Sequence, residues 1–452
     1  MENNQFLTYC TTKLSAETLN TICHRVRIMR NSYAIIAMVV VALVVGGGVY
    51  AAMASVTPSS TVSTVTSTVT TTSVSTSTTS SGGGGINAPI KVGVLEPLSG
   101  ALAGPGTGMV DAIKLAALQV NESGGINGQP IKLIIDDVQT DPQTALSDLQ
   151  NLYSVQGVQV VIGPPTTQQV LTIAQYATQN HILVVTSSAT AGQITGLSPY
   201  IFRTVPSDNI QAQAVAAYIN AKGYQRVAIV TRNDAFGQGL ANSLQSLLGS
   251  KVVSTVLVTS GQSDYTSQMQ QVKAANPDVI FYDEFVADGI VIFKNALSLG
   301  MQNIPTVGSI ELEDPSFFKD PLAAQYMAET NLTGPSAVST SNTAPYIQFA
   351  SAFNKTFGFA PGLFTGTSYD AAMLAFNAIA RAGRYNATAI ASQMVPVSMS
   401  YVGPSGYLAL NNQGDVTQVA YTYYRVNQVN STSYGFTTFG SFTPAAGISL
   451  TG

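Results

Sequence analysis

The stretch IKVGVLEPLSG, residues 90–100, opens a series of four short apolar runs that decides the fold of this chain. The runs are continuous and rich in β-branched side chains, as is typical of strands buried on both faces of a parallel sheet. Helix-like segments separate them, so an alternating α/β sheet is predicted between residues 90 and 206. The predicted strands are residues 90–95, 131–135, 158–162 and 182–185, the last three within INGQPIKLIIDDVQTDP, VQVVIGPPTTQQ and ILVVTSSAT.

The turns that follow these strands are polar and lead into helices. After the first strand, Val110, Ile113, Ala117 and Val120 fall at helical spacing, and the glycine pair at 124–125 ends that helix. In such sheets ligands bind outside the carboxyl ends of the strands, where helix N-termini present free N–H groups. The polar turn residues expected at this edge are Ser99, Thr166, Thr167, Ser187, Ser188 and Thr190.

A second alternating series follows FRTVPSD (residues 202–208), a polar, proline-bearing segment that suits a crossing between two lobes. Strand-like and helix-like runs again take turns, which predicts a second doubly wound unit. The strands are expected at residues 226–230, 252–258, 278–282 and 306–310, and the helices at residues 236–248, 265–275 and 288–299.

The last part of the chain is less regular. The pattern predicts helices at residues 346–357 and 368–382. A polar turn at 411–415 then separates two strand-like runs, 407–410 and 419–426, which indicates a hairpin. Residues 434–452 show no clear period and are expected to form a tail.

The composition excludes several classes of function. Of the 452 residues 45% are hydrophobic and only 9% are charged, with a formal net charge of -4, so the chain offers no basic surface to a nucleic acid. Both cysteines, Cys10 and Cys23, lie near the N-terminus, and the two histidines are His24 and His181. A zinc or other soft-metal site is therefore not expected, nor is a cofactor.

The N-terminal region predicts attachment to a membrane. Three arginines between residues 25 and 30 precede an apolar run at 34–54, which as a helix would span about 32 Å. The positive-inside rule then places the C-terminal part outside the cell. A retained single-pass anchor is favoured, and a cleaved signal peptide is the alternative. Residues 1–30 would be cytoplasmic, and the Ser/Thr/Gly-rich residues 55–85 would form a flexible linker.

Several motifs follow one another in order over roughly residues 89–430. They are KVGVLEPLSG (91–100), VVIGPPTT (160–167), FRTVPSD, RVAIVTRNDAFGQGL (226–240), SYDAAMLAFNAI (368–379) and GPSGYLALNNQGDV (403–416). With these motifs the chain resembles the type I periplasmic binding proteins, in particular the branched-chain amino-acid (leucine/isoleucine/valine) receptors of ABC importers. This resemblance implies two lobes joined by three crossings, with a ligand trapped when the lobes close.

The resemblance also assigns ligand contacts on the first lobe. Thr167 matches a hydroxyl residue that binds the ligand carboxylate. Ser188 and Thr190 match residues that hold the carboxylate and the ammonium through backbone and hydroxyl groups. Ser99, at the end of the first strand, is included in the predicted site because of its place at the same edge.

On the second lobe, Phe236 and Phe285 stand where the family often has tyrosines. Glu311 is the expected partner of the ligand ammonium, with Asp283 as the alternative. The phenylalanines lack hydroxyls, so the resemblance does not imply that the ligand is leucine. Two positions where bulkier side chains often line the pocket are prolines here, Pro105 and Pro165.

Two motifs admit a different chemistry. The glycines of GALAGPGTG (residues 100–108) follow a strand and precede a helix, but Met109 stands where a dinucleotide motif has its third glycine. Asp136, Asp137 and Asp141 could form a calcium or acid/base cluster. Asp141 precedes a proline, however, and is better explained as a helix cap.

The predicted contacts also have purely structural explanations. The hydroxyls of Thr167 and Thr190 could cap the helices that follow them, and Phe236 and Phe285 could belong to the core. An enzyme is not expected, because the chain has no G-x-S-x-G or H-E-x-x-H motif and His181 is the only histidine after the apolar segment.

The sequence thus predicts an α/β protein with two doubly wound, Rossmann-like lobes joined by a three-strand hinge, preceded by one transmembrane helix and a Ser/Thr-rich stalk. Lobe 1 is expected to comprise residues 89–206 and 334–400, and lobe 2 residues 207–333 and 401–433, before the tail at 434–452. The predicted function is an extracytoplasmic solute-binding protein that captures a small amino-acid-like ligand and docks on an ABC permease. The alternatives are a ligand-sensing receptor ectodomain of the same fold and the binding of a non-amino-acid solute such as an amide or a short peptide.

Overall fold

The computed structural model describes residues 86, 88–337, 340–430 and 433–451. These residues fall within one compact unit of the chain, residues 81–452. The expected cytoplasmic segment, apolar anchor or signal, and linker lie outside the described residues. Among the described residues, none of the helices has the length and apolar character needed to cross a membrane.

The first lobe is built on a parallel five-stranded sheet with the strand order β2-β1-β3-β4-β5. Each of the four apolar runs that open the fold contains one of its strands, which confirms the predicted α/β alternation. The strands are β1 (Ile90–Glu96), β2 (Ile131–Asp137), β3 (Val160–Ile162), β4 (Leu183–Thr186) and β5 (Ile201–Arg203).

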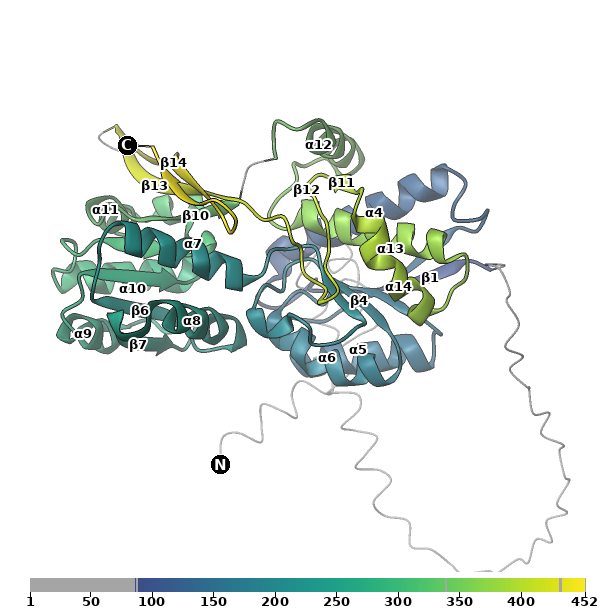
Figure 1. Ribbon diagram of the computed structural model, residues 1–452, viewed down its shortest axis with the longest axis horizontal. Helices are drawn as coiled ribbons and strands as arrows, with labels where there is room; N and C mark the ends of the chain where they lie inside the picture. The colour runs from purple at the N-terminus through teal and green to yellow at the C-terminus, as the bar shows by residue number, and fades with distance from the viewer. Residues whose placement is uncertain (1–85, 87, 338–339, 431–432, 452) are drawn as a thin grey trace, which may run out of the picture. The chain divides into compact units, whose positions relative to one another are not determined.

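Helices cover both faces of this sheet (Figure 1). Because side chains alternate along a strand, Val92 and Val94 of β1 pack in one core cluster, and Leu95 packs in another on the opposite face. The first face is covered by α4 (Ala103–Glu122), α13 (Thr365–Ala382) and α14 (Ala387–Ser398), and the second by α5 (Pro142–Ser154) and α6 (Thr167–Gln179). Helix α12 (Ala344–Phe357) packs on α4.

The helix starts follow from local sequence. Asp141 caps α5, because its Oδ1 accepts a hydrogen bond from the Thr144 backbone N–H at 2.7 Å, and a proline fills the first position of the helix. The predicted role of Asp141 as a cap is therefore confirmed.

The second lobe is built on an eight-stranded sheet with the order β15-β14-β13-β10-β9-β8-β6-β7. Its strands β6 to β10 run parallel, and β13 to β15 add an antiparallel edge. The strands are β6 (Val227–Arg232), β7 (Val252–Val258), β8 (Val279–Asp283), β9 (Thr306–Gly308), β10 (Thr333–Ala337), β13 (Tyr421–Asn430), β14 (Ser433–Thr443) and β15 (Gly447–Leu450).

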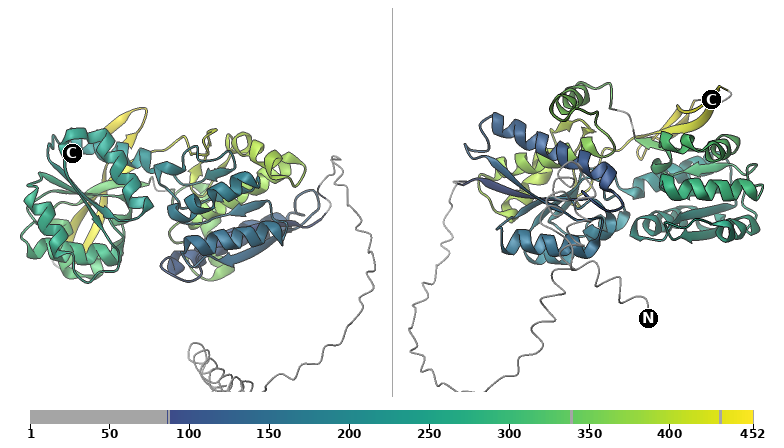
Figure 2. Two further views of the ribbon diagram at one scale, coloured as in Figure 1. Left: turned by 90° about the horizontal axis from the view of Figure 1, so that it is seen from below. Right: turned by 180° about the vertical axis from the view of Figure 1, so that it is seen from behind.

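This sheet is also covered on both faces, as the two views of Figure 2 show. Its helices are α7 (Asp208–Ala221) and α8 (Ala235–Leu248) on one face, and α9 (Thr266–Ala274), α10 (Val286–Ser298) and α11 (Pro321–Glu329) on the other. Four short 3-10 turns connect elements: η1 (Gly192–Ile194), η2 (Gly249–Lys251), η3 (Ile310–Leu312) and η4 (Pro315–Lys319).

The C-terminal segment differs from the prediction. Residues 434–451 do not form a loose tail, because β14 pairs along most of β13 and β15 pairs with β14. The predicted hairpin is also wrong in its partners. The turn at 411–415 closes only a single bridge between Leu410 and Val416, while β13 pairs with β10 and β14 instead.

The chain passes between the two sheets three times, as expected for a three-strand hinge. The passages follow β5, follow β10, and precede β13. Pairing puts Thr333–Ala337 in the second sheet, although the sequence assigns residues from 334 onward to the first lobe. Conversely, the short strands β11 (Val402–Gly403) and β12 (Gly406–Tyr407) lie against α13, where the Ser405 N–H donates to Asp370 Oδ2 at 2.9 Å.

A buried arginine ties the first passage to the third. Arg203, at the end of β5, is fully buried, and its Nη2 lies 2.6 Å from Asp415 Oδ1. Its Nη1 donates to the Thr190 carbonyl at 2.7 Å and to the Ala191 carbonyl at 2.9 Å. Its Nη2 also donates to Thr195 Oγ1 at 2.7 Å, so the guanidinium is fully used within the hinge.

Candidate ligand site at the strand ends

Thr167 carries a buried hydroxyl without a partner. It is the first residue of α6 and only 3% exposed, and its Oγ1 makes no hydrogen bond. The helix is capped instead by Thr166, whose Oγ1 accepts from the Gln169 N–H at 3.3 Å in a capping box. The cap interpretation of Thr167 is therefore wrong, because its buried hydroxyl makes no hydrogen bond to the helix.

Ser188 and Thr190 follow β4 at the same edge of the sheet. The Ser188 hydroxyl donates to the Pro165 carbonyl at 2.7 Å and is half-buried. Thr190 caps no helix, because the residue before η1 is Ala191. Its hydroxyl lies beside the Asp208 carboxyl, and its carbonyl accepts from the Asp208 N–H at 2.9 Å.

Ser99 lies at the exposed end of β1. Its hydroxyl donates to Asp137 Oδ2 at 2.6 Å, and its N–H donates to Asp137 Oδ1 at 3.1 Å. The Ser99 hydrogen bond lowers the pKa of Asp137. The Ser99 hydroxyl is thus engaged by Asp137, which closes the end of β2.

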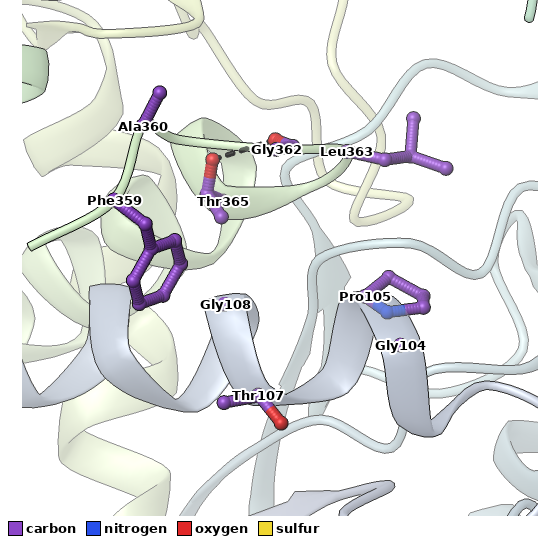
Figure 3. A pocket seen from close by; sticks show the side chains of 9 residues that line it. All are labelled: Gly104, Pro105, Thr107, Gly108, Phe359, Ala360, Gly362, Leu363 and Thr365. Carbon is purple, nitrogen blue, oxygen red and sulfur yellow. Dashed lines mark hydrogen bonds between the residues drawn. The ribbon is translucent and has the colours of Figure 1, made fainter. Parts of the chain in front are cut away.

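A hollow of about 350 Å³ adjoins the first turns of α4 (Figure 3). Pro105 lines it, and the facing wall comes from the loop before α13, where Phe359 and Leu363 are 42% and 65% exposed. Sequence reasoning missed this loop, because its apolar residues show no period. The lining residues are Gly104, Pro105, Thr107, Gly108, Phe359, Ala360, Gly362, Leu363 and Thr365.

The start of α13 connects this hollow with the β4 turn. The Ser368 and Ser187 hydroxyls are 2.8 Å apart, and the Thr204 hydroxyl donates to the Thr367 carbonyl at 2.8 Å. Thr365, one turn earlier, is a wall of the hollow. The hollow and the polar edge of the first sheet are therefore held by the same helix end.

On the second lobe the two predicted phenylalanines lie together. The rings of Phe236 and Phe285 are stacked within 12° of parallel, with centroids 6.2 Å apart. Phe285 is 37% exposed, and the guanidinium of Arg232 lies 4.0 Å from its ring centroid. The pair is thus partly accessible, and the Phe285 ring makes a cation–π contact with Arg232.

Three carboxyl groups gather at the carboxyl end of the second sheet. Asp283 ends β8, and its Oδ2 accepts from Thr231 Oγ1 at 2.8 Å. Glu311 lies in η3, directly after β9, and Asp208 begins α7. Each of the three keeps one buried oxygen without a hydrogen-bond partner.

Burial is the main cause of the perturbed titration of these groups. It raises the pKa of Asp283 to about 6 and that of Asp208 to about 7. For Glu311, burial together with the charges of Asp283 and Asp208 raises the pKa to about 8. Arg203 lowers the pKa of Asp208 and Arg232 lowers that of Asp283, but both effects are smaller than that of burial, and these arginines are paired with Asp415 and Asp234.

Sequence reasoning missed further acidic residues at the strand ends. Glu96, the last residue of β1, is fully buried with both oxygens unpartnered, and burial raises its pKa. Asp208 stands in the FRTVPSD motif and could have been singled out there. No signal in the sequence shows that it meets Asp283 and Glu311, because only the strand order brings them together.

A family profile described as "Periplasmic binding protein" matches residues 89–433. The chain belongs to this family. The resemblance predicted from the motifs is thereby confirmed, and so is the expectation that the chain is no enzyme, since the family consists of solute-binding proteins.

Curated periplasmic binding proteins match over different lengths. The Leu/Ile/Val-binding protein homolog 1 of Brucella abortus (strain 2308) is 27% identical over 354 residues, which cover 76% of this chain and 92% of the relative. The Leu/Ile/Val-binding protein BraC3 of Rhizobium johnstonii is 28% identical over 239 residues, or 51% of this chain and 64% of the relative. The chain thus spans less than two thirds of the first curated relatives that it matches.

Solved periplasmic binding proteins share the fold. A leucine-binding protein LivK from Thermotoga maritima superposes with a TM-score of 0.68 at 20% identity, covering 79% of this chain and 99% of that one. The substrate-binding protein LivJ of Streptococcus pneumoniae, in complex with isoleucine, gives 0.64 at 22% identity and covers 77% of this chain and 99% of that one. These likenesses confirm the type I fold with two lobes.

Proposed function

We propose that this protein is the extracytoplasmic solute-binding protein of an ABC importer and that it holds a small amino-acid-like ligand between its two lobes. One observation carries the proposal. The carboxyl end of the first sheet offers an unpartnered hydroxyl on Thr167, and that of the second offers unpartnered carboxylate oxygens on Asp283 and Glu311. Hydroxyls and a helix N-terminus suit a ligand carboxylate, while acidic oxygens suit an ammonium.

The roles of the individual residues in this proposal are those that the family resemblance implies. Thr167, Ser188 and Thr190 would hold the carboxylate end of the ligand, and Glu311, with Asp283 behind it, would hold the ammonium. The exposed faces of Phe236 and Phe285 would cover the apolar part. Ser99 would act indirectly, by fixing Asp137 at the edge of the first lobe.

Lobe closure is the proposed mechanism. A ligand that touches both lobes shifts the balance between open and closed forms by the difference in its contacts. The Arg203–Asp415 pair, which joins two of the three passages, would keep the hinge intact during that motion. The closed form would dock on the permease, and residues 34–54 would anchor the protein to the membrane as a single-pass helix.

A second candidate is the binding of a solute other than an amino acid. A solute-binding protein of the same fold from Rhodopseudomonas palustris BisB5 was solved with 3,4-dihydroxybenzoic acid, at a TM-score of 0.65 and 22% identity over 78% of this chain and 97% of that one. The hollow beside Pro105 has apolar walls that could accommodate a ring. A sensory ectodomain remains the alternative role for the same binding event.

Thermal unfolding of the full-length chain tests the proposal against a panel of amino acids, amides, short peptides and aromatic acids. A ligand present at a hundred times its dissociation constant adds about 2.7 kcal/mol of stability. We expect an amino acid to raise the melting temperature. If only aromatic acids do so, the second candidate replaces the first. If no compound does, the amino-acid proposal fails.

A further inference from the structure

The second lobe holds more buried carboxyl groups than one ligand ammonium requires. Glu284, next to Asp283, joins Asp208, Asp283 and Glu311 at the same end of the sheet. Asp208, Asp283 and Glu284 are each no more than 1% exposed. The four acids are electrostatically linked, since the Asp283 charge raises the pKa of each of the other three.

The two nearby arginines, Arg203 and Arg232, are bound to other groups. Arg203 is bound to Asp415 and to hinge carbonyls, and Arg232 is bound to Asp234, with a 2.9 Å hydrogen bond from Nε. Among the described residues, none of the four acids takes part in an ion pair within 4 Å. Arg203 and Arg232 influence Asp208, Asp283 and Glu284 electrostatically, but within the described part of the chain neither arginine is paired with an acid of the cluster.

Five of the carboxylate oxygens have no hydrogen-bond partner. They are Asp208 Oδ2, Asp283 Oδ1, both oxygens of Glu284 and Glu311 Oε2. Ser309 gives an independent indication. Its hydroxyl is fully buried beside the Asp283 and Glu311 carboxyls, and it also makes no hydrogen bond of normal geometry. Buried polar atoms left unpaired in this way are costly in a folded protein, and they mark a place where a partner binds.

The cluster has an accessible side. Glu311 is only half-buried, and Phe285, which follows Glu284 in the chain, is 37% exposed. Phe285 already carries the Arg232 guanidinium against its ring. A second cationic group approaching Glu311 would meet carboxylate oxygens and an aromatic surface that attracts cations.

From these observations we infer that the ligand carries a net positive charge, as an amino acid with a second cationic nitrogen on its side chain does. This inference rests on the proposed function. A neutral amino acid brings one ammonium, which satisfies one carboxylate, and its own carboxylate is met by the hydroxyls of the first lobe. A second ammonium or guanidinium is then the group that matches the remaining acids, Asp208, Asp283 and Glu284.

A purely structural explanation makes a different prediction. In that explanation the four acids are protonated groups of the core that make no contact with the ligand. In that case the protein would not distinguish a ligand that carries the second charge from one that lacks it.

The experiment compares L-lysine with L-norleucine, which differs from it only by the absence of the side-chain ammonium. Calorimetric titration of the full-length chain near neutral pH should give a dissociation constant at least about tenfold lower for L-lysine, because a paired charge that is largely desolvated contributes more than a methyl group. L-Arginine and 1,4-diaminobutane serve as further probes.

Isosteric variants locate the effect. Glu284→Gln and Asp283→Asn should each raise the dissociation constant of L-lysine about tenfold or more. The dissociation constant of L-norleucine should change by less than about threefold. Glu313→Gln, at a half-buried acid two residues after Glu311, should leave the ratio unchanged. If a variant does not fold, the comparison of ligands on the unaltered protein decides alone.

Each outcome separates the inference from the proposed function. Binding of L-norleucine as tightly as L-lysine overturns the inference and leaves the amino-acid proposal standing. Binding of 1,4-diaminobutane alone supports the inference and overturns the amino-acid proposal. Binding of none of these compounds overturns the inference, and the wider panel of amino acids then decides the proposed function.

Discussion

At the scale of single residues, two adjacent threonines have opposite roles. Thr166 caps α6, whereas the buried hydroxyl of Thr167 has no partner. Thr167→Ala should raise the dissociation constant of the ligand about ten- to a hundredfold, since a hydrogen bond to a charged group contributes about 1.5–3 kcal/mol. It should not lower the melting temperature. Thr166→Ala, the matched control, should cost about 1 kcal/mol of stability and spare affinity. Calorimetry and thermal unfolding would contradict this assignment if the two variants behaved alike.

The stability of the folded protein should depend on Asp415, the counterion of the buried Arg203. Asp415→Ala leaves a fully buried guanidinium without its counterion, although the carbonyl contacts remain. The expected cost is about 3–5 kcal/mol in the free energy of unfolding, measured in urea. Asp415→Asn retains a hydrogen-bond acceptor and should cost less. A cost below about 1 kcal/mol for the alanine variant would show that the hinge does not depend on this pair.

At the scale of elements, the C-terminal strands are an integral part of the second lobe. Phe439 of β14 is 8% exposed, and its ring centroid lies 6.2 Å from that of Tyr218 and 6.1 Å from that of Tyr423. Phe439→Ala should therefore cost about 3–5 kcal/mol in urea unfolding. Val429→Ala, at a 69% exposed position of β13, is the control and should change stability by less than about 0.5 kcal/mol. Equal, small effects would mean that β14 adds little to the fold.

The same strands show where prediction from sequence reaches its limit. The parallel strands were predictable, because β1, β4 and β8 are short apolar runs buried along their length. Strand β14 is mostly half-exposed and has no alternating pattern, so only its pairing with β13 defines it. The acidic cluster was only partly predictable for a similar reason. Asp208, Asp283 and Glu311 belong to separate elements, and their meeting depends on the strand order of the sheet.

At the scale of the whole molecule, this cluster makes the stability of the ligand-free protein depend on pH. The pKa values of Asp283, Asp208 and Glu311 lie at about 6, 7 and 8 in the folded protein, against ordinary values of 3.8 for aspartate and 4.5 for glutamate. The folded state thus binds these protons more tightly than the unfolded state does. The stabilisation is complete below about pH 4 and is lost progressively as the pH rises from there through the folded pKa values, up to about pH 8.

The other charged groups around the cluster do not offset this change. Tyr421, whose pKa burial raises, stays neutral, and Glu284, whose pKa burial raises to about 10, changes stability in the same direction as the other three acids. The free energy of unfolding, measured in urea without ligand, should therefore fall by about 2–3 kcal/mol or more between pH 5 and pH 8. Asp283→Asn combined with Glu311→Gln removes two of the titrating groups and should flatten the profile. A cationic ligand should reverse the trend, because it binds the ionised carboxylates and so stabilises the protein most at the higher pH. A ligand-free profile that is already flat would mean that these carboxyls titrate as exposed groups do, and that the cluster is open to water in solution.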